Sequence, residues 1–314
     1  VAIGHNSGAS VTTGVQNTIL GAYAGDALTD SGPVVAVGYE ALSTEDRDGG
    51  GSTAIGYQAL TTQNAGATAY NTAVGWNAGL SITTGIYNTF LGGDAGKLLT
   101  DADFNVAVGT FALDKDELGS KSTALGYAAL STQDFTTATD TFNTAVGYEA
   151  GVSVTTGVKN TLIGTTSGTS LTDADLNTAV GFDALASDTL GSRSVAIGKS
   201  TLNAQNFTTA TDTYNTAVGY HAGLAVTTGQ YNTFLGGQAG DATTSGNNNI
   251  AIGYESFTTN ILSDRNVAIG NYALATHNQA SSIDSYNVAV GFNAGLSVTT
   301  GIQNTLIGGL AGDA

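Results

Sequence analysis

The chain of 314 residues has no cysteine, no methionine and a single proline, and only 11% of its residues are charged. The absence of cysteine excludes a disulfide framework, thiolate catalysis and zinc–thiolate sites. Basic residues are scarce, because 8 Lys and Arg stand against 25 Asp and Glu. Nucleic acids and anionic membranes bind basic faces, so we expect neither partner. The chain also lacks an apolar run of about 18 residues, so we expect no membrane insertion.

Glycine and a short repeat dominate what is present. A five-residue core recurs, composed of Asn or Ser, a β-branched residue, a small residue, an aliphatic residue and Gly, as in Asn143–Gly147 and Ser194–Gly198. The closing glycine occurs 18 times, and from Gly75 its spacings run 17, 17, 17 and 21 before the series repeats. Both termini lie inside the pattern. We therefore interpret residues 1–314 as one repetitive segment of a longer chain.

The repeat predicts an all-β fold. β-Branched residues at alternate positions favour strands, and glycine ends a strand where close backbone approach leaves no room for a Cβ. The unit is too short for a helix–turn–helix repeat. We predict a parallel β-solenoid (a β-roll or β-helix) of about 18 coils, with 17-residue coils and a 72-residue four-coil super-repeat.

Two faces of each predicted strand differ in residue size. Period-2 alternation places the β-branched and aliphatic residues on one face and the alanines on the other. Neither face is typical of a purely solvent-exposed surface. Because one coil buries little apolar area, we expect one face to fill the solenoid and the other to pack against sister chains. The expected assembly is an intertwined or side-by-side homotrimer.

A column of asparagines opens the repeat core. Stacked coils would place these side chains above one another, where each can bond the backbone or the asparagine of the next coil. We expect this structural ladder at Asn71, Asn88, Asn105, Asn143, Asn160, Asn177, Asn215 and Asn232.

Particular units resemble repeats of known fibrous proteins. Ser194–Leu202 and Asn266–Leu274 resemble the head repeats of trimeric autotransporter adhesins. Asn71–Gly79 followed by Thr83–Gly85 and Asn88–Gly96 is more similar to repeats of phage tail-fibre proteins. The resemblance covers essentially the whole chain and implies a homotrimeric β-roll or β-solenoid fibre that is extracellular or carried on a virion. Adhesin coils are usually shorter than the coils of this chain. Two locations therefore stay open, a phage tail fibre and a bacterial cell surface.

We therefore expect a non-catalytic structural fibre, the shaft of a phage tail fibre or a related extracellular filament that supports host or surface attachment. His5, His221 and His277 occupy different repeat positions and are expected at the surface, so no serine or threonine has a histidine base. Two alternatives stay open. One is a bacterial surface adhesin that binds host or matrix ligand through repeat loops. The other is a glycan-cleaving spike, which needs a carboxylate pair in a groove.

Acidic residues offer the only cofactor alternative. The segment from Asp46 to Gly50 resembles half a calcium loop, and two aspartate pairs recur along the chain. Calcium requires six to eight oxygen ligands, and the glycine–aspartate nonapeptide of calcium-binding β-rolls is absent. We expect no cofactor and interpret the pairs as solvated turns. The calcium alternative rests on Asp46, Asp48, Asp101, Asp103, Asp173 and Asp175.

Three basic residues, Lys121, Arg193 and Arg265, share one column before the fourth unit of a set. They form either inter-chain ion pairs that fix the register of a trimer or surface pairs worth about 0–1 kcal/mol. The acidic residues just upstream of them are Asp116, Asp188 and Asp264.

Every fourth coil is longer, and the residue after the closing glycine is often aromatic. We expect Phe135 and Phe207 to project from the longer coils and to contact a cell-surface glycan or protein receptor, with avidity along the fibre. The alternative is that both pack between chains or cover the solenoid edge. Aromatic residues after glycine, such as Tyr57 and Trp76, either stack on sugars or pack over turns.

Overall fold

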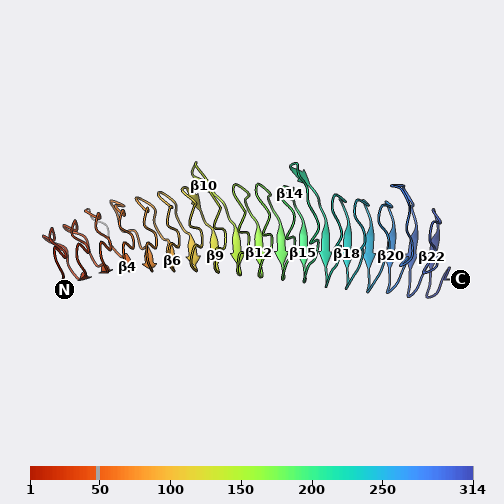
Figure 1. The fold of residues 1–314 in the computed structure, drawn as a ribbon, viewed down its shortest axis with the longest axis horizontal. Coiled ribbons are helices and arrows are strands. Elements are labelled where there is room, and N and C mark those ends of the chain that lie inside the picture. The colour runs from red at the N-terminus through yellow and green to blue at the C-terminus, as the bar shows by residue number, and fades with distance from the viewer. Residues whose placement is uncertain (47–49, 314) are drawn as a thin grey trace. The chain divides into compact units, whose positions relative to one another are not determined.

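The computed structural model describes residues 1–46 and 50–313, so Asp48 lies outside the described residues. The chain divides into two compact units, Val1–Val158 and residues 159–313. Each unit is a stack of coils in which every turn of the chain adds one short strand (Figure 1). Among the described residues, no helix has the length and apolar character that crossing a membrane requires.

The main strands of the first unit pair in parallel, each with the next in the series. They are β1 (Ala2–Ile3), β2 (Thr18–Leu20), β3 (Val35–Val37), β4 (Thr53–Ile55), β5 (Thr72–Val74), β6 (Thr89–Leu91), β7 (Val106–Val108), β9 (Thr123–Leu125) and β11 (Thr144–Val146). A second, two-stranded parallel pair joins β8 (Gly119–Ser120) to β10 (Thr139–Asp140).

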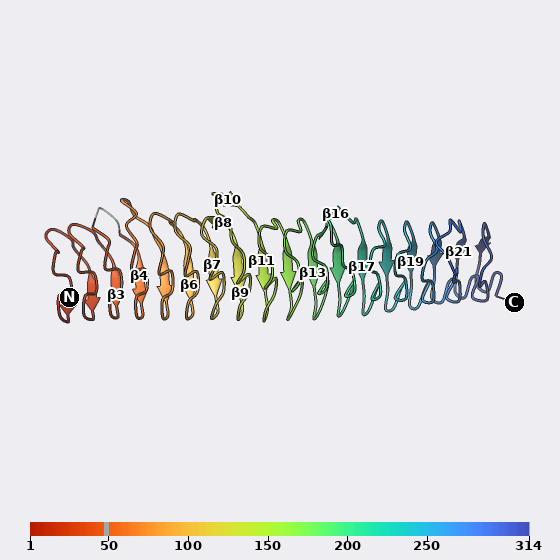
Figure 2. The same cartoon turned by 45° about the horizontal axis from the view of Figure 1, so that its top comes forward.

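The second unit repeats this arrangement. Its strands are β12 (Thr161–Ile163), β13 (Thr178–Val180), β15 (Val195–Ile197), β17 (Thr216–Val218), β18 (Thr233–Leu235), β19 (Ile250–Ile252), β20 (Val267–Ile269), β21 (Val288–Val290) and β22 (Thr305–Ile307). Its additional parallel pair is β14 (Gly191–Ser192) with β16 (Thr211–Asp212). The predicted all-β parallel solenoid is confirmed within each unit, where the strands lie one above the next (Figure 2).

The centre of each strand faces the interior. In β7, Ala107 is completely buried, whereas Val106 and Val108 on either side remain partly exposed. The same pattern recurs along both units. The structure therefore assigns the alanine face to the inside of the solenoid and the β-branched and aliphatic face to the outside.

Glycine closes each strand because neighbouring coils nearly touch there. Gly109 has a φ of 136°, which side chains rarely adopt. A Cβ at this position would lie 2.2 Å from the carbonyl oxygen of Gly126 in the next coil. The closing-glycine column is thus required by both backbone conformation and coil spacing.

The four-coil period follows from the volume of interior side chains. Phe90, in the second coil of its set, is fully buried. A Cβ at Gly96 would lie 2.3 Å from its ring, and one at Gly79 would lie 2.6 Å away. In the next coil Ala107 replaces the phenylalanine and Leu113 replaces the glycine, and both are buried. The second coil thus pairs a large strand residue with glycine, and the third pairs alanine with leucine. The first coil carries both alanine and glycine, and its Gly79 leaves room for the Phe90 ring of the second coil, so the interior stays filled.

Candidate interaction surface

The outer face of the sheet consists of the residues three and one positions before each closing glycine. These positions hold only Thr, Val, Ile and Leu. The side chains one position before glycine form an exposed aliphatic row, and Leu91 is 47% exposed. Other members with more than a third of their surface exposed are Ile3, Leu20, Ile55 and Leu125 in the first unit and Ile163, Ile197 and Ile307 in the second. A contiguous apolar surface of this kind marks an interaction site more often than scattered hydrophobic residues do.

A second set of exposed side chains, the edge row, occupies the position five residues before each closing glycine. Tyr70, Tyr87 and Phe104 stack there with ring centroids 5.7 and 5.2 Å apart. All three residues have φ values between 52° and 59°. This conformation is costly for a bulky side chain. The edge row therefore places exposed rings next to the outer face despite local strain.

The three predicted basic residues belong to the edge row and pair within the chain. Their partners are not Asp116, Asp188 or Asp264, which the sequence suggested. The pairs are Lys121–Asp140, Arg193–Asp212 and Arg265–Asp284. Each cation also lies 5.3–5.8 Å from the ring centroid of Phe142, Tyr214 or Tyr286, respectively. These pairs are solvent-exposed, so water screens them and they add little to stability. An ion pair to a second chain stays a prediction.

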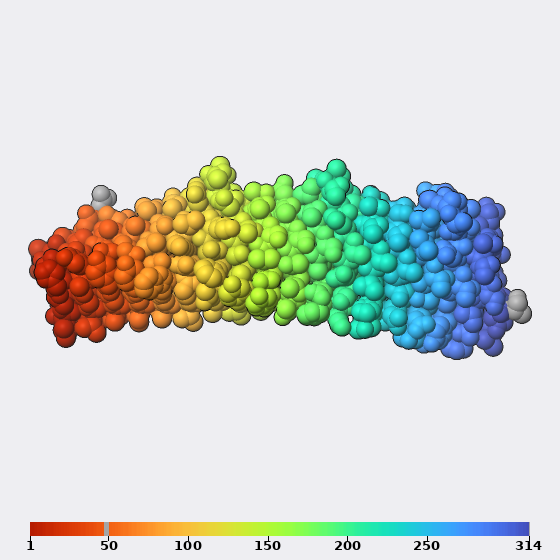
Figure 3. All heavy atoms as spheres, viewed as in Figure 1, coloured from red at the N-terminus to blue at the C-terminus, as the bar shows by residue number. Residues whose placement is uncertain are grey.

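The prediction that Phe135 and Phe207 project from the longer coils is wrong. Their side chains are only 6% and 5% exposed, because both turn inward beneath their loops. The loops carrying β10 and β16 do stand out from the surface of their units (Figure 3). Residues 136–138 of the first loop are exposed, as are Asp134 and Asp140. The burial of Phe135 and Phe207 leaves these two rings little surface for the glycan contact that the sequence suggested.

Buried carboxylates anchor these loops. Asp116 is fully buried, and its Oδ1 accepts hydrogen bonds from the amides of Gly119 and Phe135, both at 3.0 Å. Its Oδ2 accepts a hydrogen bond from Nε2 of Gln133. Burial raises the pKa of the Asp116 carboxyl above its ordinary value, against the lowering effect of these hydrogen bonds. Asp188 has the same environment, and its pKa is also raised by burial.

Sequence reasoning missed this interior network, although a signal was present. Seven positions after glycine, the first and second coils of a set carry apolar residues such as Ile82 and Leu99. The third and fourth coils carry Asp116 and Gln133 at the same position. A column that alternates between apolar and polar residues with the four-coil period indicates a buried polar layer rather than a surface turn.

One predicted surface histidine lies in this layer. His277 is fully buried, where earlier sets carry a glutamine, and its Nε2 lies 3.3 Å from Oγ of Ser285. Burial lowers the pKa of its imidazole below the ordinary value. The expectation of a surface position is therefore wrong for His277, because the residue belongs to an interior column. His5 is exposed and His221 is half-buried.

The asparagine ladder is present in the structure. All eight predicted asparagines are buried, and each donates from Nδ2 to a backbone carbonyl of the following coil. Successive members are also joined, since the amide of Asn88 donates to Oδ1 of Asn71 at 2.8 Å and that of Asn105 donates to Oδ1 of Asn88 at 2.9 Å. The ladder links each coil to its neighbours through buried hydrogen bonds.

The aspartates of the calcium alternative that the structure describes lie between the strands. Oδ1 of Asp103 accepts a hydrogen bond from the amide of Ile86 at 2.8 Å, and Asp101 accepts one from Oγ1 of Thr84. Oδ1 of Asp46 accepts from Nδ2 of Asn64 at 2.8 Å, and the amide of Asp175 donates to a serine. Within residues 1–46 and 50–313, no three His, Asp or Glu side chains cluster as metal ligands would. Calcium binding at the six aspartates, of which Asp48 lies outside the described residues, stays the untested alternative to the prediction of no cofactor.

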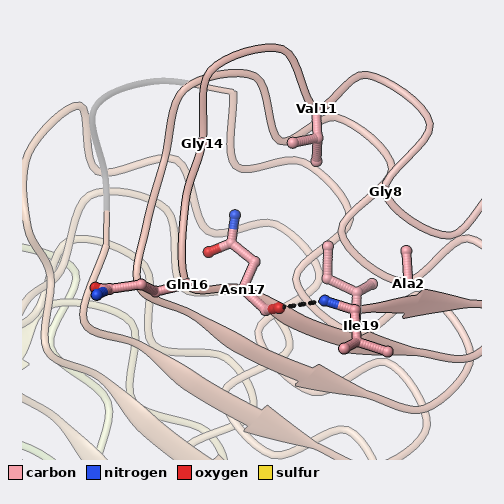
Figure 4. Close-up of a pocket in the computed structure, with 8 residues that line it drawn as sticks. Ala2, Gly8, Val11, Gly14, Gln16, Asn17 and Ile19 are labelled. Atoms are coloured by element: carbon pink, nitrogen blue, oxygen red, sulfur yellow. Dashed lines mark hydrogen bonds between the residues drawn. The ribbon is translucent and has the colours of Figure 1, made fainter.

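A cavity of about 250 Å³ lies at the first coil of the first unit (Figure 4). Ala2, Val11, Asn17 and Ile19 contribute to its lining, and the Val1 amino group donates to the carbonyl of Asn17 at 2.8 Å. In later coils the positions equivalent to Ala2, Val11 and Asn17 are buried, as at Ala36, Leu28 and Asn71. None of the residues that line this cavity has a titratable side chain, so its chemistry does not indicate a catalytic site.

Comparison of the chain with protein-family models, with curated proteins and with solved structures gives no match. The functional argument therefore rests on the coils and on the surfaces that they expose.

Proposed function

We propose that the chain is a non-catalytic structural fibre segment, the shaft of a phage tail fibre or of a related extracellular filament that supports attachment to a host or surface. The observation that carries this proposal is the outer face of the sheet, where each coil adds one uncharged, partly exposed pair of Thr, Val, Ile or Leu side chains. Such a face supports side-by-side association with other chains along its length.

The partner that fits this face best is another copy of the chain. Identical copies have the same coil spacing, so their aliphatic rows match at every coil. The chain has a net charge of −17, but the two rows of the outer face carry no charged residue. Copies can therefore pack these faces without like-charge repulsion across the contact. A closed homotrimer would bury three outer faces around one axis and leave the acidic residues toward water.

Native mass spectrometry tests this association. The expected mass is three times that of a single chain. A variant with Leu91→Glu and Leu125→Glu places carboxylates in the outer face, and it should dissociate because buried unpaired charges are costly. Thr137→Glu, in an exposed loop of the same unit, is the matched control and should leave the mass unchanged. A wild-type monomer over the accessible concentration range would contradict the proposal.

The location requires a separate experiment. Gold-labelled antibody against this segment, applied to the native source, should mark phage tails or free filaments. Label confined to bacterial cell surfaces would instead support the alternative of a surface adhesin.

A further inference from the structure

The residues that follow the closing glycines form a ring row. Tyr39, Tyr57 and Trp76 occupy it in three successive coils of the first unit. Their ring centroids are 5.3 and 4.1 Å apart, with interplanar angles of 12° and 11°. The next two coils carry Gly93 and Thr110 at this position. The register of β5 with β6 and the hydrogen bond from the amide of Asp94 to the carbonyl of Trp76, at 2.8 Å, place Gly93 directly beside Trp76.

The ring row has a gap at Gly93. A Cβ built on Gly93 has no neighbouring atom within 4 Å, and its φ lies outside the left-handed region. Neither backbone conformation nor crowding therefore requires glycine there. Since stacked coils are about 4.8 Å apart, the gap is about as thick as one ring. Trp76 is 58% exposed, and Tyr57 covers only one face of its indole.

Polar side chains border this gap. Asn77 follows Trp76 and Asp94 follows Gly93, so both lie one residue further along the same two coils. Nδ2 of Asn77 donates to Oδ1 of Asp94 at 3.0 Å, and Nζ of Lys97 lies 3.6 Å from the same oxygen. An apolar ring face next to a carboxylate, an amide and an ammonium group matches a ligand with a flat C–H face and hydroxyl groups at its rim.

We propose that the gap at Gly93 binds one pyranose ring of a β-linked glycan whose hydroxyl groups are all equatorial. The axial C–H bonds of such a sugar form a flat apolar face that stacks on Trp76, while its equatorial hydroxyls reach Asp94 and Asn77. The sugar would continue the ring row where the chain supplies no side chain.

The second unit shows why a sugar fits this gap better than a cation does. There, Nζ of Lys199 lies 6.0 Å from the ring centroid of Phe182 and 5.7 Å from that of Tyr220, so two rings flank a cation that the chain itself supplies. The gap at Gly93 has a ring on one side and Thr110 on the other. The second-unit Gly237 offers no such space, since a Cβ there would lie 3.4 Å from Cδ2 of Tyr254.

Trp76 is the only tryptophan of the chain, so its fluorescence reports on this site without a label. Excitation at the red edge of the absorption band avoids the tyrosines. In the full chain without ligand, acrylamide should quench Trp76 efficiently. Titration with cellohexaose should then shift and saturate the emission and protect Trp76 from acrylamide. Poor quenching in the free protein would overturn the proposal, because it would mean that another copy already covers the ring.

Substitutions separate this site from general surface effects. Gly93→Tyr fills the gap without a clash and should weaken cellohexaose binding at least about tenfold, as should Trp76→Ala followed by calorimetry. Gly309→Tyr is the matched control, because it fills an open position of the same row in the second unit and should change affinity by no more than about twofold. Absence of a saturable response, or an unchanged response in Gly93→Tyr, would overturn the proposal. The result is independent of the fibre proposal, which depends on the outer face.

Discussion

Replacing the interior pair Phe90 and Gly96 by Ala and Leu tests whether side-chain volume in the interior sets the four-coil period. Phe90→Ala removes a fully buried ring, which should cost about 3–5 kcal/mol of unfolding free energy. Gly96→Leu alone should also destabilise the chain by about 1–3 kcal/mol or more, because its Cβ would lie 2.3 Å from the Phe90 ring. The double variant reproduces the Ala107 and Leu113 arrangement of the following coil. It should therefore be more stable than the sum of the single losses predicts.

The expected coupling between the two sites is about 1–3 kcal/mol in favour of the double variant. Urea unfolding followed by circular dichroism gives the free energies, and hydrogen exchange of β6 and its neighbours shows whether the loss is local. Combining Phe90→Ala with Gly240→Leu is the matched control, since Gly240 contacts Phe234 and not Phe90. The losses of unfolding free energy from these two substitutions should add. If Phe90→Ala and Gly96→Leu also add, interior volume does not set the four-coil period.

Further predictions address the ladder, the buried acids and the closing glycines. Asn105→Ala should destabilise urea unfolding by about 2–5 kcal/mol, because it leaves the amide of Ser122 and a buried carbonyl without partners. Folding raises the pKa of Asp116 and Asp188, so the native state binds protons more tightly than the unfolded chain. Thermal stability should therefore increase as pH falls through the folded-state pKa values of these two residues. Replacing both by Asn should flatten this dependence. An unchanged pH profile of that variant would contradict the raised pKa values of the buried carboxyls. Gly109→Ala should cost more than about 3 kcal/mol because of its φ and the close Gly126 carbonyl, whereas Gly93→Ala should be nearly neutral in the same assay.

Much of the architecture could be predicted because a coil contacts mainly its neighbours. The spacing of the closing glycines predicted the coil length, and the asparagine column predicted a ladder that the structure contains. The direction in which alanine points could not be predicted, because both strand faces are small or apolar and alternation treats them alike. The volume of the side chains determines which strand face points into the solenoid. The narrow interior accepts Ala107 beside Leu113, and it accepts Phe90 only beside glycine.

Long-loop positions were harder to predict, because they depend on the path of the next coil. Phe135 looked like a projecting ring, but its amide is held by the buried Asp116 and its ring turns inward. Lys121 was expected to pair with an acid upstream, yet it reaches Asp140 in the following coil. His277 looked like a lone surface histidine until its column was compared with Gln133 of the earlier set.

The match between large strand residues and glycines limits how such a chain can change in length during evolution. Duplication or loss of one complete four-coil set leaves every coil beside a neighbour of the type it already contacts, because interior contacts extend only to adjacent coils. Gain of a single coil of the Leu113 type between β5 and β6 would put a leucine where Gly79 now lies, in the space that the Phe90 ring occupies. Recombination between repeats should therefore be tolerated in steps of four coils. Related chains should then differ in length by whole four-coil sets, because the packing of the interior disfavours other steps.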